Sequence, residues 1–168
     1  SEPYLTVKVP DIDSILGDKL TAFAPNTIGV PYFRGEINMS VEIIKQLFDI
    51  GTLVPKIIKV KNTHKSFITT GENQIKYRNP KIKLTNVYND IFQTSLIIAK
   101  RDRNIQEQDK TNYKNLQQGI TSFNQFLTTG SFRIDDAIIS AGKTTWLMAI
   151  LKAQNFDNIV LYNDENNL

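Results

Sequence analysis

Hydrophobic residues along this chain recur mainly at intervals of three and four positions, the spacing that gives a helix one apolar face. The first such stretch carries Ile12, Leu16, Leu20 and Phe23. The same spacing predicts helices at 11–24, 40–53, 84–99, 111–127 and 134–154. Alternation in YLTVKVP predicts a short strand at 4–10, whereas 57–62 and 66–70 fit either an extended or a helical segment. We therefore expect a mainly α (α+β) protein, a helical bundle-like domain with a few short strands.

Polar residues and a glycine indicate where the first two helices begin and end. Asp11, Asp13 or Ser14 can cap the first helix, because their side-chain oxygens accept N–H groups that have no partner within a helix. Ser40 is the expected cap of the second helix, and Gly51 is its expected end.

Composition excludes several classes of protein and site. A chain of 168 residues with 40% apolar residues suits a single folded domain over 1–168. No apolar run reaches 18 residues, so we expect no membrane contact. The absence of cysteine excludes disulfides and thiolate sites and fits a cytoplasmic location. The single histidine, His64, is expected in a solvated loop. Because the chain starts with Ser1 rather than Met, we expect a processed or truncated polypeptide.

Positive charge is concentrated in segment 54–83, although the whole chain carries only +3. This basic segment holds eight lysine or arginine residues against one glutamate, a net charge of +7, with Phe67 and Tyr77 between them. Such a segment can bind the phosphates of a nucleotide or of RNA. The alternative is a solvated surface with no ligand.

The stretch AIISAGKTTW, 137–146, contains the last three letters of the phosphate-binding motif GxxxxGK[ST]. The motif needs glycine at its first position, and that position holds Ala137. Apolar residues around it already follow a helical spacing, so we interpret the stretch as a helix. Gly142 is then expected to allow close packing of a neighbouring helix, and Lys143 is expected to be solvated.

Two pairs of aspartates are candidates for metal binding. Asp11 and Asp13 form an Asp-x-Asp pair, the spacing with which some nucleotidyltransferases hold two metal ions. They follow a proline and lead directly into a helix, so capping explains them better. Asp135 and Asp136 similarly fit the first turn of a helix, where carboxylates complement its dipole.

The stretches SILGDKLTAFAPNTIGVPYF and EIIKQLFDIGTL together resemble the C-terminal half of the AbiEii-type nucleotidyltransferases, toxins of abortive-infection toxin–antitoxin systems. A family helix of the pattern L-x-x-K-L-x-A is matched at 16–22, and a second one, similar to R-D-L-Y-D-L, at 45–50. ENQIKYRNP and VYNDIF, at 72–80 and 87–92, also look similar to family members.

The resemblance implies catalytic roles for Lys19 and Asp49, and a nucleotide-binding role for Lys45, which stands where the family usually has arginine. Gln46 departs from the acidic residue of the family, so a carboxylate there is lost. Without the resemblance, Lys19 and Asp49 would form an ion pair between packed helices.

The resemblance also implies a parent enzyme that transfers a nucleotide from an NTP, with Mg²⁺, onto an acceptor such as tRNA. The Gly-Ser turn and metal-binding Asp-x-Asp that precede these helices in the family are missing from 1–168. We therefore expect this chain to bind no metal and to be inactive alone. The alternative is a non-enzymatic helical interaction module that binds a protein partner, such as an antitoxin.

Overall fold

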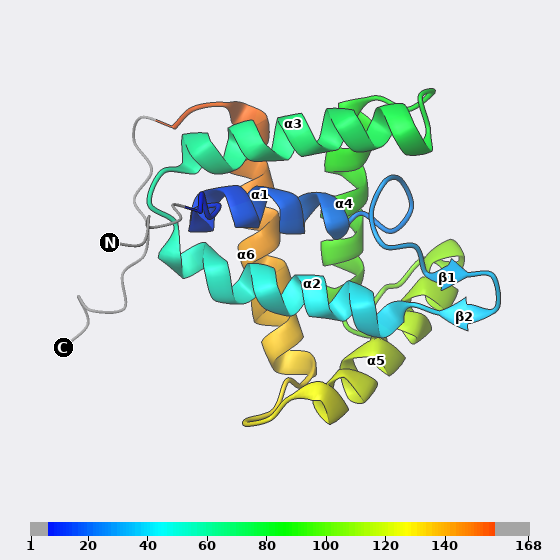
Figure 1. Cartoon of the computed structure of the whole chain (residues 1–168). Helices are drawn as coiled ribbons and strands as arrows, with labels where there is room; N and C mark the ends of the chain where they lie inside the picture. The colour runs from blue at the N-terminus through cyan, green and yellow to red at the C-terminus, as the bar shows by residue number, and fades with distance from the viewer. Residues whose placement is uncertain (1–6, 157–168) are drawn as a thin grey trace.

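The computed structural model describes residues 7–156, which form six α-helices and one two-stranded hairpin (Figure 1). The helices are α1 (Ile12–Ala22), α2 (Ser40–Leu53), α3 (Val60–Arg78), α4 (Leu84–Ala99), α5 (Lys110–Phe123) and α6 (Ile134–Ala153). The hairpin pairs β1 (Phe33–Arg34) with β2 (Ile37–Asn38) in antiparallel register. Single 3₁₀ turns occur at Val54–Lys56, Glu107–Asp109 and Asn124–Phe126. The mainly helical fold class is confirmed.

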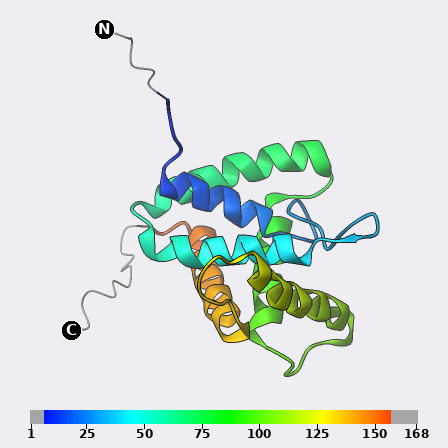
Figure 2. The same cartoon turned by 60° about the horizontal axis from the view of Figure 1, so that its bottom comes forward.

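Three helices form one layer, and two others cross behind it. α1 lies between α3 and α2, and α4 and α6 pack together on the other side of this layer (Figures 1 and 2). α5 packs on α2 at the lower edge of Figure 1. The core between the layers contains residues from all six helices, among them Leu16, Leu47, Phe67, Ile91, Leu116 and Leu147.

The basic segment folds largely into one helix, α3, instead of the two short pieces that the sequence leaves undecided. Its buried positions are Val60, Thr63, Phe67 and Gly71, which follow the spacing of a helix face. Two of these four residues are not large apolar residues, and the hydrophobic pattern is correspondingly weak. The helix gains its stability by packing on α1.

The strand expected at 4–10 lies partly outside the described residues. Its described part, residues 7–10, belongs to no strand, and the side chains of Val7 and Val9 are exposed. The observed hairpin lies instead in the loop between α1 and α2, and it projects from the helical body (Figure 1).

The expected ends of α2 are wrong at both positions. Ser40 is the first residue of the helix rather than its cap, and its N–H donates to Oδ1 of Asn38 over 2.9 Å. Gly51 does not end the helix, which continues to Leu53. A Cβ atom at Gly51 would lie 2.8 Å from Cβ of Ser140, so glycine is required there by the close approach of α2 and α6.

Candidate functional site

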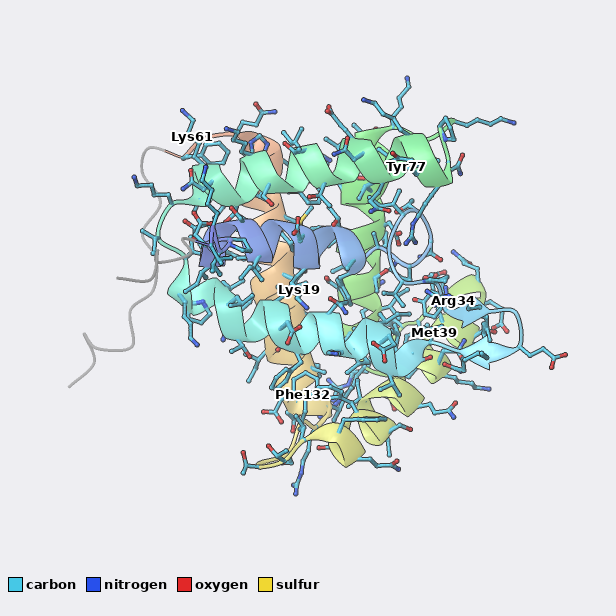
Figure 3. The ribbon with its side chains drawn as sticks, viewed as in Figure 1. Lys19, Arg34, Met39, Lys61, Tyr77 and Phe132 are labelled. Carbon is cyan, nitrogen blue, oxygen red and sulfur yellow. The ribbon has the colours of Figure 1, made fainter. Side chains whose placement is uncertain are left out.

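Lys19 and Asp49, the expected catalytic pair, are brought together by the packing of α1 on α2. Nζ of Lys19 lies 2.7 Å from Oδ2 of Asp49, and both side chains are a little under one third exposed, at 29% and 28%. Figure 3 shows Lys19 between the two helices. The neighbouring Leu20 and Ile50 are fully buried, which fixes the backbone on either side of the pair. The ion pair expected from the sequence therefore exists, at a position that solvent reaches.

Lys45, the expected nucleotide-binding residue, lies one helical turn before Asp49 on α2. It is exposed and forms no ion pair with any residue in the described range 7–156. Its neighbour Gln46 donates to the backbone oxygen of Glu42 over 3.4 Å, within the same helix. The structure thus places Lys45 one turn before Asp49 on the same helix, without an ion pair between them.

The Asp11 and Asp13 carboxylates have different structural roles, and only Asp11 caps a helix. Asp11 is the N-cap of α1, and its Oδ1 accepts the N–H of Ser14 over 2.7 Å. Asp13 is buried and instead accepts the backbone N–H groups of Ile58 and Lys59, over 2.9 and 2.8 Å, just before α3 begins. Capping is therefore confirmed for Asp11 only, whereas Asp13, inside α1, holds the backbone that precedes α3.

Magnesium does not fit the described part of the chain. Among residues 7–156, no group of three or more histidine, cysteine, aspartate or glutamate side chains is close enough to hold a metal ion. Asp135 and Asp136 lie in the first turn of α6, where Oδ2 of Asp136 accepts the N–H of Arg133 over 2.9 Å. Their expected helix-terminal role is confirmed.

Two of the three expectations for AIISAGKTTW and its neighbours need correction. The stretch is helical, as expected, inside α6. Gly142, however, faces solvent, and an added Cβ would meet no atom within 4 Å, so it marks no close helix contact. Lys143 is half-buried rather than solvated, and its Nζ donates to the backbone oxygen of Gly51 over 3.2 Å. The close contact between α2 and α6 is made by Gly51 and Ser140.

A buried polar cluster around Asp90 is absent from the sequence-based expectations. The Asp90 carboxylate accepts the backbone N–H and side-chain amide of Asn26, at 2.8 and 2.7 Å, and the hydroxyl of Thr27 at 2.8 Å. Thr94 also donates to it over 3.3 Å. Burial raises the pKa of Asp90, and these hydrogen bonds oppose that shift. These hydrogen bonds hold the loop that follows α1 against α4.

A signal for this cluster was present in the sequence. Asp90 shares a helical face with Val87, Ile91 and Thr94, so a carboxylate falls among core positions of the helix at 84–99. A buried carboxylate requires several hydrogen-bond donors, and the sequence does not show which residues supply them.

The charged residues of the basic segment are distributed along α3 and the turns on either side of it. Lys61 and Tyr77 mark opposite ends of this helix (Figure 3). Arg78 is already engaged, because its Nη1 donates to the backbone oxygen of Gly29 over 2.9 Å. Lys76, Lys81 and Lys83 are exposed near the C-terminal end of α3, beside Tyr77, which is 90% exposed.

His64 lies on α3 rather than in a loop, which corrects the sequence-based expectation. Its ring centre lies 5.1 Å from that of Phe156. Burial lowers the pKa of His64, so the ring is neutral at neutral pH.

No family model, curated protein or solved structure matches this chain. Within residues 7–156, no helix is both long and apolar enough to cross a bilayer.

Proposed function

We propose that this chain is the C-terminal helical part of an AbiEii-like nucleotidyltransferase, and that the Lys19–Asp49 pair contacts the incoming nucleotide. The supporting observation is the pair itself, which joins α1 to α2 over 2.7 Å at a partly exposed position. A lysine ammonium is a compact charge that suits a triphosphate. Because solvent reaches Lys19, its ammonium can exchange the Asp49 carboxylate for a phosphate oxygen without a buried charge being left unpaired.

In this proposal Asp49 holds Lys19 in place, and Lys45 adds a second positive charge one turn away on α2. In the parent enzyme, Mg²⁺ would supply charge neutralisation at the phosphates. The described residues do not provide its ligands, so those ligands belong to the Gly-Ser and Asp-x-Asp half that the resemblance implies. The chain alone is then inactive in nucleotide transfer and retains only weak nucleotide binding.

The acceptor in this proposal is an RNA, such as tRNA, held by its phosphates at the C-terminal end of α3. Lys76, Lys81 and Lys83 are exposed there, and Tyr77 presents a ring on which a base can stack.

A titration of the labelled chain with ATP and magnesium, followed by NMR, tests the nucleotide site. We expect shifts centred on Lys19, Lys45 and Asp49, and we expect Lys19→Ala to abolish them. Lys110→Ala is the matched control, because Lys110 also forms an ion pair, with Glu107, but does so at the start of α5. Absence of shifts at millimolar ATP, or equal shifts in the Lys19→Ala chain, would contradict the proposal.

The second candidate is an interaction module, which the solvent side of α6 favours. Ile139 and Trp146 are 58% and 40% exposed, and Gly142 and Ala149 lie on the same side of this helix. A helix with apolar residues on its solvent side as well as its core side is typical of a helix that another surface covers. The titration separates the two candidates, since a chain that only binds a protein partner gives no shifts with ATP.

A further inference from the structure

An open groove of about 1180 Å³ runs beside the N-terminal half of α3. It is bounded by α3, by the residues just before that helix and by the residues that follow α6. None of its lining residues belongs to α1 or α2, so it is separate from the Lys19–Asp49 pair. Its lining includes Ile58, Lys59, Lys61, His64, Lys65 and Ile68.

All charged side chains that line this groove are positive. Lys59, Lys61 and Lys65 line it, and its lining contains no aspartate or glutamate. No carboxylate in the described range lies within ion-pair distance of these three lysines. His64 is neutral because burial lowers its pKa, so the lysines alone supply the charge. The groove therefore attracts a ligand with several negative charges.

The apolar part of the groove is mainly aliphatic. Ile58 is 72% exposed, an unusual exposure for a large apolar side chain, and Ile68 and Val60 also contribute to the lining. The one aromatic pair, His64 and Phe156, consists of two rings that pack on each other at 5.1 Å. Strands of nucleic acid are held by aromatic rings on which successive bases stack. Aliphatic walls instead match the aliphatic side chains of a peptide.

His64 lines the groove beside the lysines. Its Nε2 is buried and has no hydrogen-bond partner among the described residues. A buried ring nitrogen without a partner is costly.

We propose that this groove binds an acidic peptide segment of a partner protein, in which glutamate or aspartate alternates with aliphatic side chains. In an extended segment, alternate side chains point to opposite sides. The aliphatic set then contacts the exposed Ile58, which precedes α3, and the carboxylates of the other set contact Lys61 and Lys65 on α3. The inference does not depend on the nucleotide chemistry proposed above.

The test is a fluorescence-anisotropy titration of the full chain with a labelled peptide of alternating glutamate and leucine. We expect saturable binding that weakens as salt is added. Lys61→Glu with Lys65→Glu should weaken it by roughly tenfold or more, because like charges then face each other. Lys100→Glu with Lys114→Glu, two exposed lysines that do not line the groove, is the matched control and should leave the affinity unchanged. Circular dichroism and melting temperature show that each variant is folded.

Two comparison ligands decide which chemistry the groove recognises. A peptide with serine in place of every leucine should bind about fivefold or more weakly, since it lacks the aliphatic contact. Ile58→Ser should remove most of the difference between the two peptides. The proposal is overturned if the leucine peptide does not bind, if both peptides bind equally, or if oligouridylate of the same charge binds the groove more tightly than the leucine peptide.

Discussion

The Lys19 ammonium lies 2.7 Å from the Asp49 carboxylate, and this ion pair links two helices that are antiparallel neighbours (Figure 1). The same geometry suits a structural ion pair and a nucleotide contact, so stability and binding must be measured separately. Partly exposed ion pairs contribute little to stability because water solvates both charges in the unfolded chain.

We expect Lys19→Met to change the free energy of unfolding by about 1 kcal/mol or less. The same substitution should abolish the ATP-induced shifts, since the ammonium is lost while the helix packing is kept. Urea unfolding, read by circular dichroism, measures the first effect, and the NMR titration measures the second. A loss of stability well above this value, with unchanged ATP binding, would make the pair purely structural.

The contact between Gly51 and Ser140 predicts opposite effects for two glycine substitutions. Gly51→Ala places a Cβ 2.8 Å from Cβ of Ser140, so we expect a loss of about 1–3 kcal/mol by overpacking. Gly142→Ala meets no atom within 4 Å and removes an exposed glycine from a helix interior, so it should stabilise by up to about 1 kcal/mol. Thermal unfolding of both variants checks this. A lower melting temperature for Gly142→Ala would contradict the solvent-facing placement of Gly142.

Alanine substitutions at Asp11, before α1, and at Asp13, within α1, should lower the stability by different amounts. Asp13→Ala removes a buried acceptor and leaves the N–H groups of Ile58 and Lys59 without their part-buried hydrogen bonds, so we expect a loss of about 1–3 kcal/mol. Asp11→Ala removes only an exposed cap of α1, and its effect should be smaller. Urea unfolding of both variants gives the comparison. Equal losses would argue against the link between Asp13 and α3.

Asp90 predicts a pH dependence of stability. Burial raises its folded-state pKa above the ordinary value of 3.8, so the folded chain holds the proton more tightly than the unfolded chain. The stability that this group contributes is therefore fully present below the unfolded pKa and is lost as the pH rises through the folded pKa. In the Asp90→Asn chain this position does not titrate, so it contributes no pH dependence.

We therefore expect the free energy of unfolding of the wild-type chain, relative to the Asp90→Asn chain, to fall between acidic and neutral pH. Urea unfolding at a series of pH values measures the difference. A constant difference, or one that grows with pH, would show that the hydrogen bonds from Asn26, Thr27 and Thr94 outweigh the cost of burial.

The sequence by itself determined the helical class and most helix positions. The helix predicted at 84–99 has the same bounds in the structure, because its apolar positions are large and regularly spaced. The sequence also identified Lys19 and Asp49 as a possible ion pair on adjacent helices, which the structure contains. The nucleotide role of that pair stays a prediction.

Only the tertiary structure decided the features that depend on residues far apart in the chain. The sequence did not predict α3 as one helix, because Thr63 and Gly71 on its buried face interrupt the apolar pattern. Gly51 and Gly142 look alike in the sequence, and only the position of Ser140 shows which one lies between helices. Asp13 and Asp90 carry hydrogen bonds to residues 45 and 64 positions away. Local pattern reports which face of a helix is apolar, whereas the partner of a buried polar group is set by how the helices pack.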